Sequence, residues 1–348
     1  MRAPGKRVAI WVGSSTTVLL VASTVLFRDQ AWALYLAYHF KGIGVVVVDD
    51  SNPMRAGMTP VGDRVQCLTR EGKVKWGWTG LSPGGEFCAL QGLALDPERA
   101  RIYVQDMARN KILALDSRGS EVFTIDHPNA IAVAVDPKIG EIWVIYDESY
   151  SKWGLKGETA VYDPSGARLA VHPWGGRSIV FNRFDDSFWV AGAEVFKVDR
   201  NGRKLTSGPD RPGWWWFSVA PHHRDGSVWV FGHLPPNDDR VVLHLDGEGK
   251  LLREVRFEGK RPTSVACDPM TGIAWVACPE ESSVERIPVE GEPLRPLSFP
   301  AWDITFSERT GTAWLATADK IMAVSSTGEV LAEHAFGAIH SIVWIAAP

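Results

Sequence analysis

A short apolar strand with an aromatic residue at its centre recurs along most of this 348-residue chain. The strand first occurs as Ile-Tyr-Val around Tyr103, and a tryptophan takes the same place in each later copy. The later copies centre on Trp143, Trp189, Trp229, Trp275 and Trp314, at intervals of 40, 46, 40, 46 and 39 residues. Each copy follows another apolar strand and precedes a third strand, a turn and a fourth strand. A four-stranded repeat of about 44 residues is typical of a β-propeller blade.

The two ends of the repeat region together supply a seventh copy. Residues 340–348 contain a first strand with nothing after it, and residues 44–78 contain second, third and fourth strands with no first strand. Pairing the two ends would close the ring and cover a strand edge that otherwise exposes unpaired backbone groups. We therefore predict an all-β, seven-bladed β-propeller over residues 44–348, after an N-terminal region of residues 1–43. A six-bladed ring is the alternative if residues 44–78 lie outside it.

The first copy resembles a known repeat. Residues 92–119, GLALDPERARIYVQDMARNKILALDSRG, have the Gly-Leu-Ala start, the Tyr-Val-x-Asp strand and the glycine turn of the NHL repeat. The Trp-Val strands of the later copies are similar to those of the seven-bladed streptogramin B lyase type. This resemblance extends over residues 44–348 and implies a propeller, a fold that serves enzymes, receptors and scaffolds alike.

The lyase resemblance also implies a catalytic pattern, which this chain matches at one position. The pattern has a histidine at the start of the first strand in two successive blades and a glutamate in the following loop. His340 fits the first-strand position, whereas Trp302 stands one blade earlier, and Asp49 and Asp50 stand where the glutamate is expected. Related lactonase propellers imply a Glu/Asn/Asp metal site, of which Asn129 alone can be placed. We predict no metal ligands and identify no cofactor.

The N-terminus differs in character from the repeats. Residues 8–27 carry no charge and are long enough to cross a bilayer as a helix, and basic residues precede them. Because basic flanks stay in the cytoplasm, we predict a single-pass anchor with the propeller outside the cytoplasm. A cleaved signal peptide, with a site at Ala31-Trp32-Ala33, is the alternative and would leave a secreted or periplasmic protein.

The charge of the chain excludes one class of partner, and its cysteines fit no metal site. The net charge is −4, and Lys and Arg do not cluster beyond the first seven residues, so we expect no nucleic-acid binding. Cys67, Cys88, Cys267 and Cys278 match no metal motif. Local disulfides Cys67–Cys88 and Cys267–Cys278 remain open beside buried free thiols.

Long and uneven connections are expected on one face of the ring, where binding residues usually lie. These connections are residues 49–63, 79–91, 147–158, 206–216 and 232–239. The catalytic candidates in or near them are His127, His334, His340 and Glu281, because His and Glu carry protons near neutral pH. The binding candidates are Trp153, Trp214, Trp215, Arg211, His172 and His233. Hydrogen-bonding histidines and tryptophan packing between blades are the alternative roles.

These features favour a membrane-anchored, extracytoplasmic propeller that binds or scaffolds a protein or an envelope polymer. The alternative function is a lyase or hydrolase acting on a small molecule at the channel mouth, with His340 and a second channel histidine or an acid from residues 280–281. The turn His222-His223-Arg224-Asp225 is expected on the opposite face as a solvated hairpin.

Overall fold

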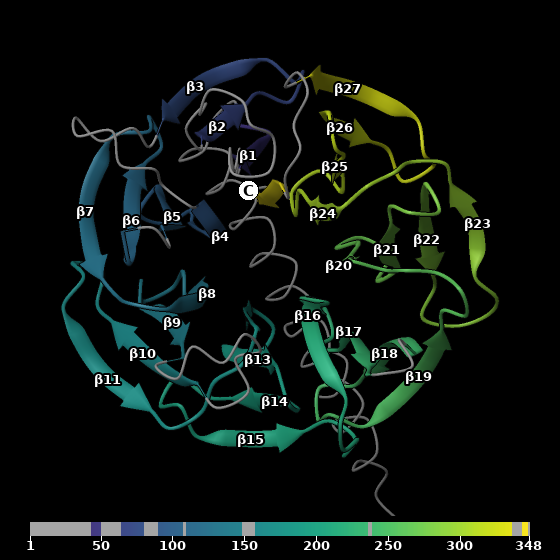
Figure 1. Cartoon of the computed structure of the whole chain (residues 1–348), viewed down its shortest axis with the longest axis horizontal. Coiled ribbons are helices and arrows are strands. Elements are labelled where there is room, and N and C mark those ends of the chain that lie inside the picture. Colours follow the sequence, from purple (N-terminus) through teal and green to yellow (C-terminus); the bar gives the residue numbers. More distant parts are fainter. Residues whose placement is uncertain are drawn as a thin grey trace, which may run out of the picture.

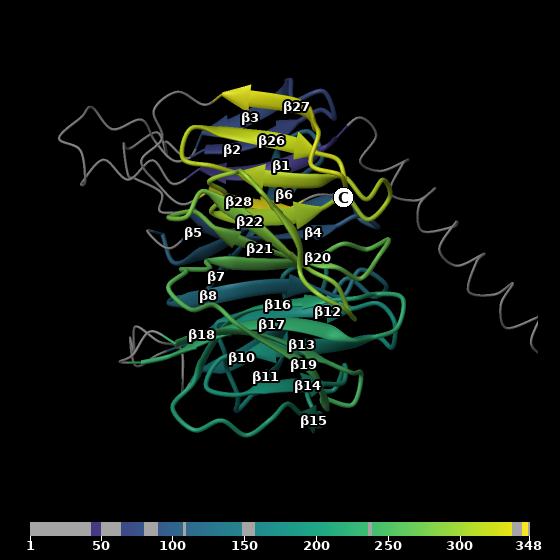
Figure 2. The same ribbon diagram turned by 90° about the vertical axis from the view of Figure 1, so that its right-hand side faces the viewer.

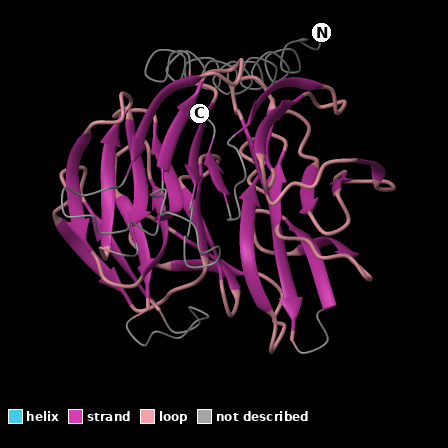
Figure 3. Ribbon diagram, turned by 45° about the horizontal axis from the view of Figure 1, so that its top comes forward, coloured by secondary structure: helices cyan, strands magenta, loops and turns pink. Residues whose placement is uncertain are grey.

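The computed structural model describes residues 43–49, 64–79, 90–106, 109–147, 157–235, 239–335 and 343–346. Within these residues the chain forms strands, turns and loops (Figure 3). The strands build seven four-stranded antiparallel sheets around a common axis, which confirms the predicted seven-bladed propeller (Figure 1). Figure 2 shows the ring from the side, with the strands running from one face toward the other.

Each sheet is one blade, and its strands follow one another from the axis outward. Blade 1 contains β28 (Val343–Ala346), β1 (Val45–Asp49), β2 (Arg64–Leu68) and β3 (Val74–Thr79). Blade 2 contains β4 (Leu90–Asp96), β5 (Arg101–Asp106), β6 (Lys111–Asp116) and β7 (Glu121–Asp126). Blade 3 contains β8 (Ala130–Val135), β9 (Ile142–Tyr146), β10 (Glu158–Tyr162) and β11 (Arg168–His172). Blade 4 contains β12 (Ser178–Asn182), β13 (Ser187–Ala191), β14 (Val195–Val198) and β15 (Lys204–Ser207).

The remaining three blades have the same strand order. Blade 5 contains β16 (Trp215–Pro221), β17 (Val228–Leu234), β18 (Asp239–Leu245) and β19 (Leu251–Arg256). Blade 6 contains β20 (Ser264–Cys267), β21 (Ala274–Cys278), β22 (Ser283–Ile287) and β23 (Leu294–Leu297). Blade 7 contains β24 (Asp303–Phe306), β25 (Ala313–Ala316), β26 (Lys320–Val324) and β27 (Val330–Ala335). The outermost strands β3, β7, β11, β15, β19, β23 and β27 form the circumference (Figure 1).

The two ends of the chain close the ring as predicted. Strand β28 pairs antiparallel with β1, from Val46 opposite Ala346 to Asp49 opposite Val343. It also lies beside the innermost strands β24 and β4 of the neighbouring blades. Residues 44–78 therefore contribute to the ring, and the six-bladed alternative is wrong.

The recurring aromatic residue of each second strand packs between neighbouring blades. Trp143 of blade 3 is fully buried and shares an apolar cluster with Ile179 and Phe188 of blade 4. Trp314 of blade 7 packs in the same way against Val45 of blade 1. Among the described residues there are seven such clusters, one at each junction between blades. Each blade thus buries both of its faces, which explains why apolar and polar residues do not alternate along the second strands.

In blades 2 to 5 the turns between third and fourth strands share an aspartate at their start and a glycine three residues later. In blade 3, Oδ1 of Asp163 accepts the backbone N–H groups of Ser165 and Ala167 at 2.8 and 3.0 Å. Gly166 in the same turn has a φ of 89°, a left-handed conformation that glycine adopts at little cost. The same aspartate contacts recur at Asp116, Asp199 and Asp246.

His244 makes the packing between blades 5 and 6 sensitive to pH. Its side chain is 1% exposed and stacks on Trp229, with the ring centroids 4.2 Å apart. Burial lowers the pKa of His244 from 6.5 to about 4, although the charge of Asp225 opposes the shift. The unfolded chain binds the proton at higher pH than the folded chain. The free energy of unfolding therefore falls as the pH falls from 6.5 toward 4, by about 3 kcal/mol.

Urea unfolding at pH 7 and pH 4 measures this contribution. The variant His244→Phe keeps an aromatic ring against Trp229 but does not titrate, so its loss of stability on acidification should be smaller by about 3 kcal/mol. An equal loss in the two proteins would contradict the assignment to His244.

The described cysteines are free thiols, and the predicted N-terminal anchor lies outside the described residues. Cys267 pairs in register with Ala274, while Cys278 lies at the other end of β21, so the local disulfide Cys267–Cys278 is wrong. Cys67 is buried and free, and Cys88 lies outside the described residues. The anchor predicted over residues 8–27 also lies outside them, and no helix in the described ranges is long and apolar enough to cross a membrane.

Candidate functional site

The ring has two faces that carry different connections. The hairpin face carries the turns between first and second strands and between third and fourth strands. The loop face carries the loops between second and third strands and the connections from one blade to the next. A cavity that combines charged and apolar side chains lies on each face.

The loop-face cavity, which we call the groove, is lined by residues of blade 5 and of its connections to the neighbouring blades. Its volume is about 370 Å³. Trp214 and Phe257, each less than one-tenth exposed, supply its apolar part. Charged side chains make up the rest of the lining: Asp239, Arg240, Arg256, Glu258, Lys260 and Arg261. The groove therefore offers both signs of charge around a small aromatic centre.

Ion pairs hold the arginines of the groove in place. Arg256 Nε lies 3.0 Å from Glu254 Oε1, and Arg261 Nη1 lies 3.2 Å from Glu280 Oε1. Arg211 also pairs with Glu254, and its hydrogen bond lowers the pKa of that carboxyl. These contacts orient the guanidinium groups before any partner arrives, which reduces the entropy lost on binding.

The three consecutive tryptophans point to two different places. Trp214 and Trp216 stack with centroids 5.6 Å apart and belong to the core cluster between blades 4 and 5. Trp215 points away from them and contacts His233, with ring centroids 5.4 Å apart. Arg211 lies with its Cζ 5.6 Å from the Trp214 ring. The structure thus brings Trp214 to the groove, with Arg211 against the Trp214 ring, and places Trp215 with His233 in a separate contact.

The other candidates on the loop face make packing or ion-pair contacts. His127 is buried, with its ring centroid 4.3 Å from that of Tyr146, and its Nδ1 lies 3.1 Å from the Pro128 carbonyl oxygen. Glu281 Oε1 accepts the backbone N–H of Arg261 at 3.1 Å. These contacts place the two candidates in different blades, blade 3 and blade 6.

Two further histidines lie on outermost strands, away from the axis. His172 ends β11 and stacks on Trp174, with parallel rings 5.7 Å apart. A Cβ on Gly202, in the outer turn of blade 4, would overlap the His172 ring, so His172 helps to pack blade 3 on blade 4. His334 lies in β27 of blade 7. His340 and Trp153 lie outside the described residues.

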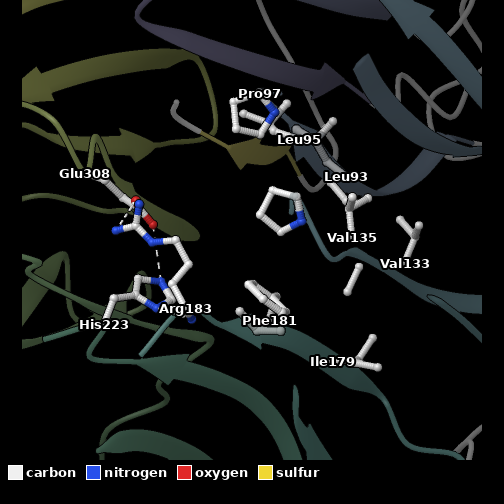
Figure 4. A pocket seen from close by; sticks show the side chains of 14 residues that line it. Leu93, Leu95, Pro97, Val133, Val135, Ile179, Phe181, Arg183, His223 and Glu308 are labelled. Carbon is white, nitrogen blue, oxygen red and sulfur yellow. Dashed lines mark hydrogen bonds and ion pairs between the residues drawn. The ribbon is translucent and has the colours of Figure 1, made fainter. Parts of the chain in front are cut away.

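The hairpin-face cavity lies along the axis and has one apolar and one charged side (Figure 4). Its volume is about 220 Å³. The apolar side comes from the innermost strands β4, β8 and β12, through residues such as Leu93, Val133 and Phe181. The charged side consists of Arg183, His223 and Glu308, which we call the triad.

The triad joins three blades across the axis. Arg183, His223 and Glu308 occupy the turns between first and second strands in blades 4, 5 and 7. Arg183 Nη2 lies 2.7 Å from Glu308 Oε2, and His223 Nε2 lies 3.2 Å from Glu308 Oε1. The backbone N–H of Arg183 donates to His223 Nδ1 at 3.3 Å, which leaves the His223 proton on Nε2, facing Glu308.

The contacts of Glu308 lower the pKa of its carboxyl group. Burial by itself raises the pKa of the Glu308 carboxyl, but the charge of Arg183 and the hydrogen bond from His223 outweigh this effect. The result is a pKa of about 2. The turn at residues 222–225 lies on the hairpin face as expected, and Arg224 and Asp225 are exposed there, but His222 is buried and His223 is half-buried and bound to Glu308.

The sequence contains a signal for the triad at a position that the predictions did not consider. In blades 2 to 7 one turn position lies six residues before the second-strand aromatic residue. That position is proline in blades 2, 3 and 6 and ionisable in blades 4, 5 and 7. The occupants in blade order are Pro97, Pro137, Arg183, His223, Pro269 and Glu308. Equivalent positions of a ring lie at the same level around its axis, so three ionisable residues there can meet.

No metal site accompanies either cavity within the described ranges, where no three His, Cys, Asp or Glu side chains are grouped to hold an ion. Asn129 has a φ of 56°, and its carbonyl oxygen accepts the Asp147 backbone N–H at 3.2 Å. This residue therefore shapes a turn.

Comparison with known proteins identifies the fold. No protein-family model matches the sequence, and no curated protein matches it. Among solved structures, the chain is similar to a chain of hydrazine synthase from Kuenenia stuttgartiensis, with a TM-score of 0.61 and 10% sequence identity. The match covers 76% of this chain and 90% of that chain. At this identity the likeness concerns the propeller fold alone.

Proposed function

We propose that this chain is a binding module that holds a protein partner against the loop face of its propeller. The groove carries this proposal, because it combines a tryptophan, several arginines and acidic residues in one concave surface. Tryptophan and arginine are the residue types that most often dominate protein interfaces. Carboxylates beside guanidinium groups suit a partner with both signs of charge, as protein surfaces have, better than a uniformly anionic polymer.

The proposal includes a location outside the cytoplasm, with the chain attached to the membrane through residues 8–27. The uncharged length of that segment and its basic flank support this location. A cleaved signal peptide would leave the same binding module secreted or periplasmic. The repeat-level resemblance to NHL and streptogramin B lyase propellers is compatible with a binding role, because this fold often serves receptors and scaffolds.

Charge reversal in the groove tests the binding role. We expect the double variant Arg256→Glu/Arg261→Glu to weaken the partner at least tenfold, because it replaces two oriented guanidinium groups with repelling charges. The measurement is extraction of the tagged full-length chain from its native membranes in mild detergent, with co-purifying chains quantified by mass spectrometry.

The matched control is Arg118→Glu. Arg118 is also an exposed arginine paired with an acid, Asp116, but it lies in a turn of the hairpin face. A partner that is retained by the control and lost by the double variant supports the proposal. A partner that the double variant and the control retain equally would exclude the groove as the binding surface. A bound glycan in place of a protein would identify the partner as an envelope polymer.

A further inference from the structure

The hairpin-face cavity is large enough for a small organic molecule. Its volume of about 220 Å³ exceeds the volume of about 150 Å³ at which a cavity lined by Leu, Ile and Phe holds benzene. Its position along the axis, on the face opposite the groove, makes it independent of the partner surface proposed above.

The apolar side of the cavity fits a single ring. Leu93, Val133 and Phe181 come from three successive blades and present aliphatic and aromatic carbon toward the same space (Figure 4). Val180, next to Phe181 on β12, also lines the cavity and is half-buried. An apolar ring of a ligand would replace water against these side chains, which is favourable by about 25 cal/mol per Å² of surface removed from water.

The charged side of the cavity selects against charged ligands. Arg183 and Glu308 already pair with each other, so a carboxylate would be repelled by Glu308 and an amine by Arg183, while the opposite charge that each could bind is already neutralised. A hydroxyl group both donates and accepts. Guanidinium groups donate up to five hydrogen bonds and carboxylates accept up to about four, so the pair can bind a hydroxyl in addition to its present contacts.

We propose that this cavity is a binding site for an uncharged molecule built of one apolar ring and a hydroxyl group. The ring lies against β4, β8 and β12, and the hydroxyl lies between Arg183 and Glu308. The alkylphenols are the simplest members of this chemical class.

The test is a calorimetric titration of the full chain at pH 7 with 4-ethylphenol, ethylbenzene and 4-ethylbenzoate. We expect 4-ethylphenol to bind at least about tenfold more tightly than either analogue, since a hydrogen bond to a charged group contributes a factor of about ten or more. Equal affinity for ethylbenzene would overturn the role of the triad. Saturable binding by none of the three would overturn the site.

Two substitutions locate the binding. Val180→Phe fills the cavity and should reduce the affinity for 4-ethylphenol at least tenfold. Any heat without saturation that remains with this variant measures the uptake of 4-ethylphenol by detergent. Glu308→Gln should reduce the affinity about tenfold or more. Arg256→Glu, in the groove, should leave it unchanged. Binding that survives Val180→Phe would overturn the proposal even if Glu308→Gln does not fold.

Discussion

Removal of residues 340–348 is expected to abolish the cooperative unfolding of the ring as a whole. The deletion removes β28, which pairs with β1 and lies beside β4 and β24. Strand β1 then becomes an edge with unpaired backbone groups, and blade 1 retains three strands. If the ring opens next to blade 1, Val45, Leu68 and Trp314 lose their burial, at about 1.5–3 kcal/mol each. That sum approaches the total stability of a typical domain, about 5–15 kcal/mol.

Thermal unfolding followed by circular dichroism checks this result. The shortened chain should show a midpoint lower by more than about 10 °C, or no cooperative transition at all, because a protein of this size loses about 2–4 °C per kcal/mol. A chain lacking only residues 347–348, which follow β28, is the matched control and should unfold as the parent does. A parental midpoint for the longer deletion would show that closure by β28 does not hold the ring together.

Replacement of Trp229 by alanine is expected to destabilise the ring by about 3–5 kcal/mol. Trp229 is fully buried between blades 5 and 6, and its ring stacks on His244. Its Nε1 donates to the Gly272 carbonyl oxygen of blade 6 at 2.9 Å. The substitution therefore creates a cavity at a junction between blades and also leaves a buried carbonyl group without its donor.

The control for this substitution is a tryptophan outside the core. Trp302 is 39% exposed, so Trp302→Ala should change the free energy of unfolding by less than about 1 kcal/mol. Urea unfolding of the two variants and the parent measures both values. Similar losses in the two variants would contradict the conclusion that second-strand aromatics stabilise the junctions between blades.

The fold could be predicted because each blade repeats the same local rules. The apolar strands, the second-strand aromatic residue and the glycine of the outer turn recur at nearly constant spacing, and each has its own physical cause. Trp143 and Trp314 illustrate this, since both were identified as the central residue of a second strand from the repeat alone, and both pack between blades in the structure. The closure by β28 followed from the same pattern, because one first strand and three later strands were left over.

The candidate site could be predicted only in part. Trp214 was identified and lies at the groove, and Arg211 was identified and lies against the Trp214 ring. The ion pairs of Arg256 with Glu254 of the same strand and of Arg261 with Glu280 of blade 6 were not predicted. His127 and His172 were singled out as histidines near loops, whereas their rings pack against aromatic side chains. A residue type that suits chemistry suits packing as well, and only the folded structure shows which role it has, even where the packing partner is as near in sequence as Trp174 is to His172.

The sequence by itself predicted the seven-bladed ring, with six blades as the alternative, and the strand order of each blade, because these follow from local strand propensity and a fixed period. The pairing of β28 with β1 in the structure then excluded the six-bladed alternative. Tertiary structure alone decided which side chains meet across the axis. Arg183 and Glu308 are 125 positions apart in the chain and three blades apart in the ring, yet they form an ion pair. Their approach depends on the radius and closure of the whole ring, a long-range property that no single repeat contains.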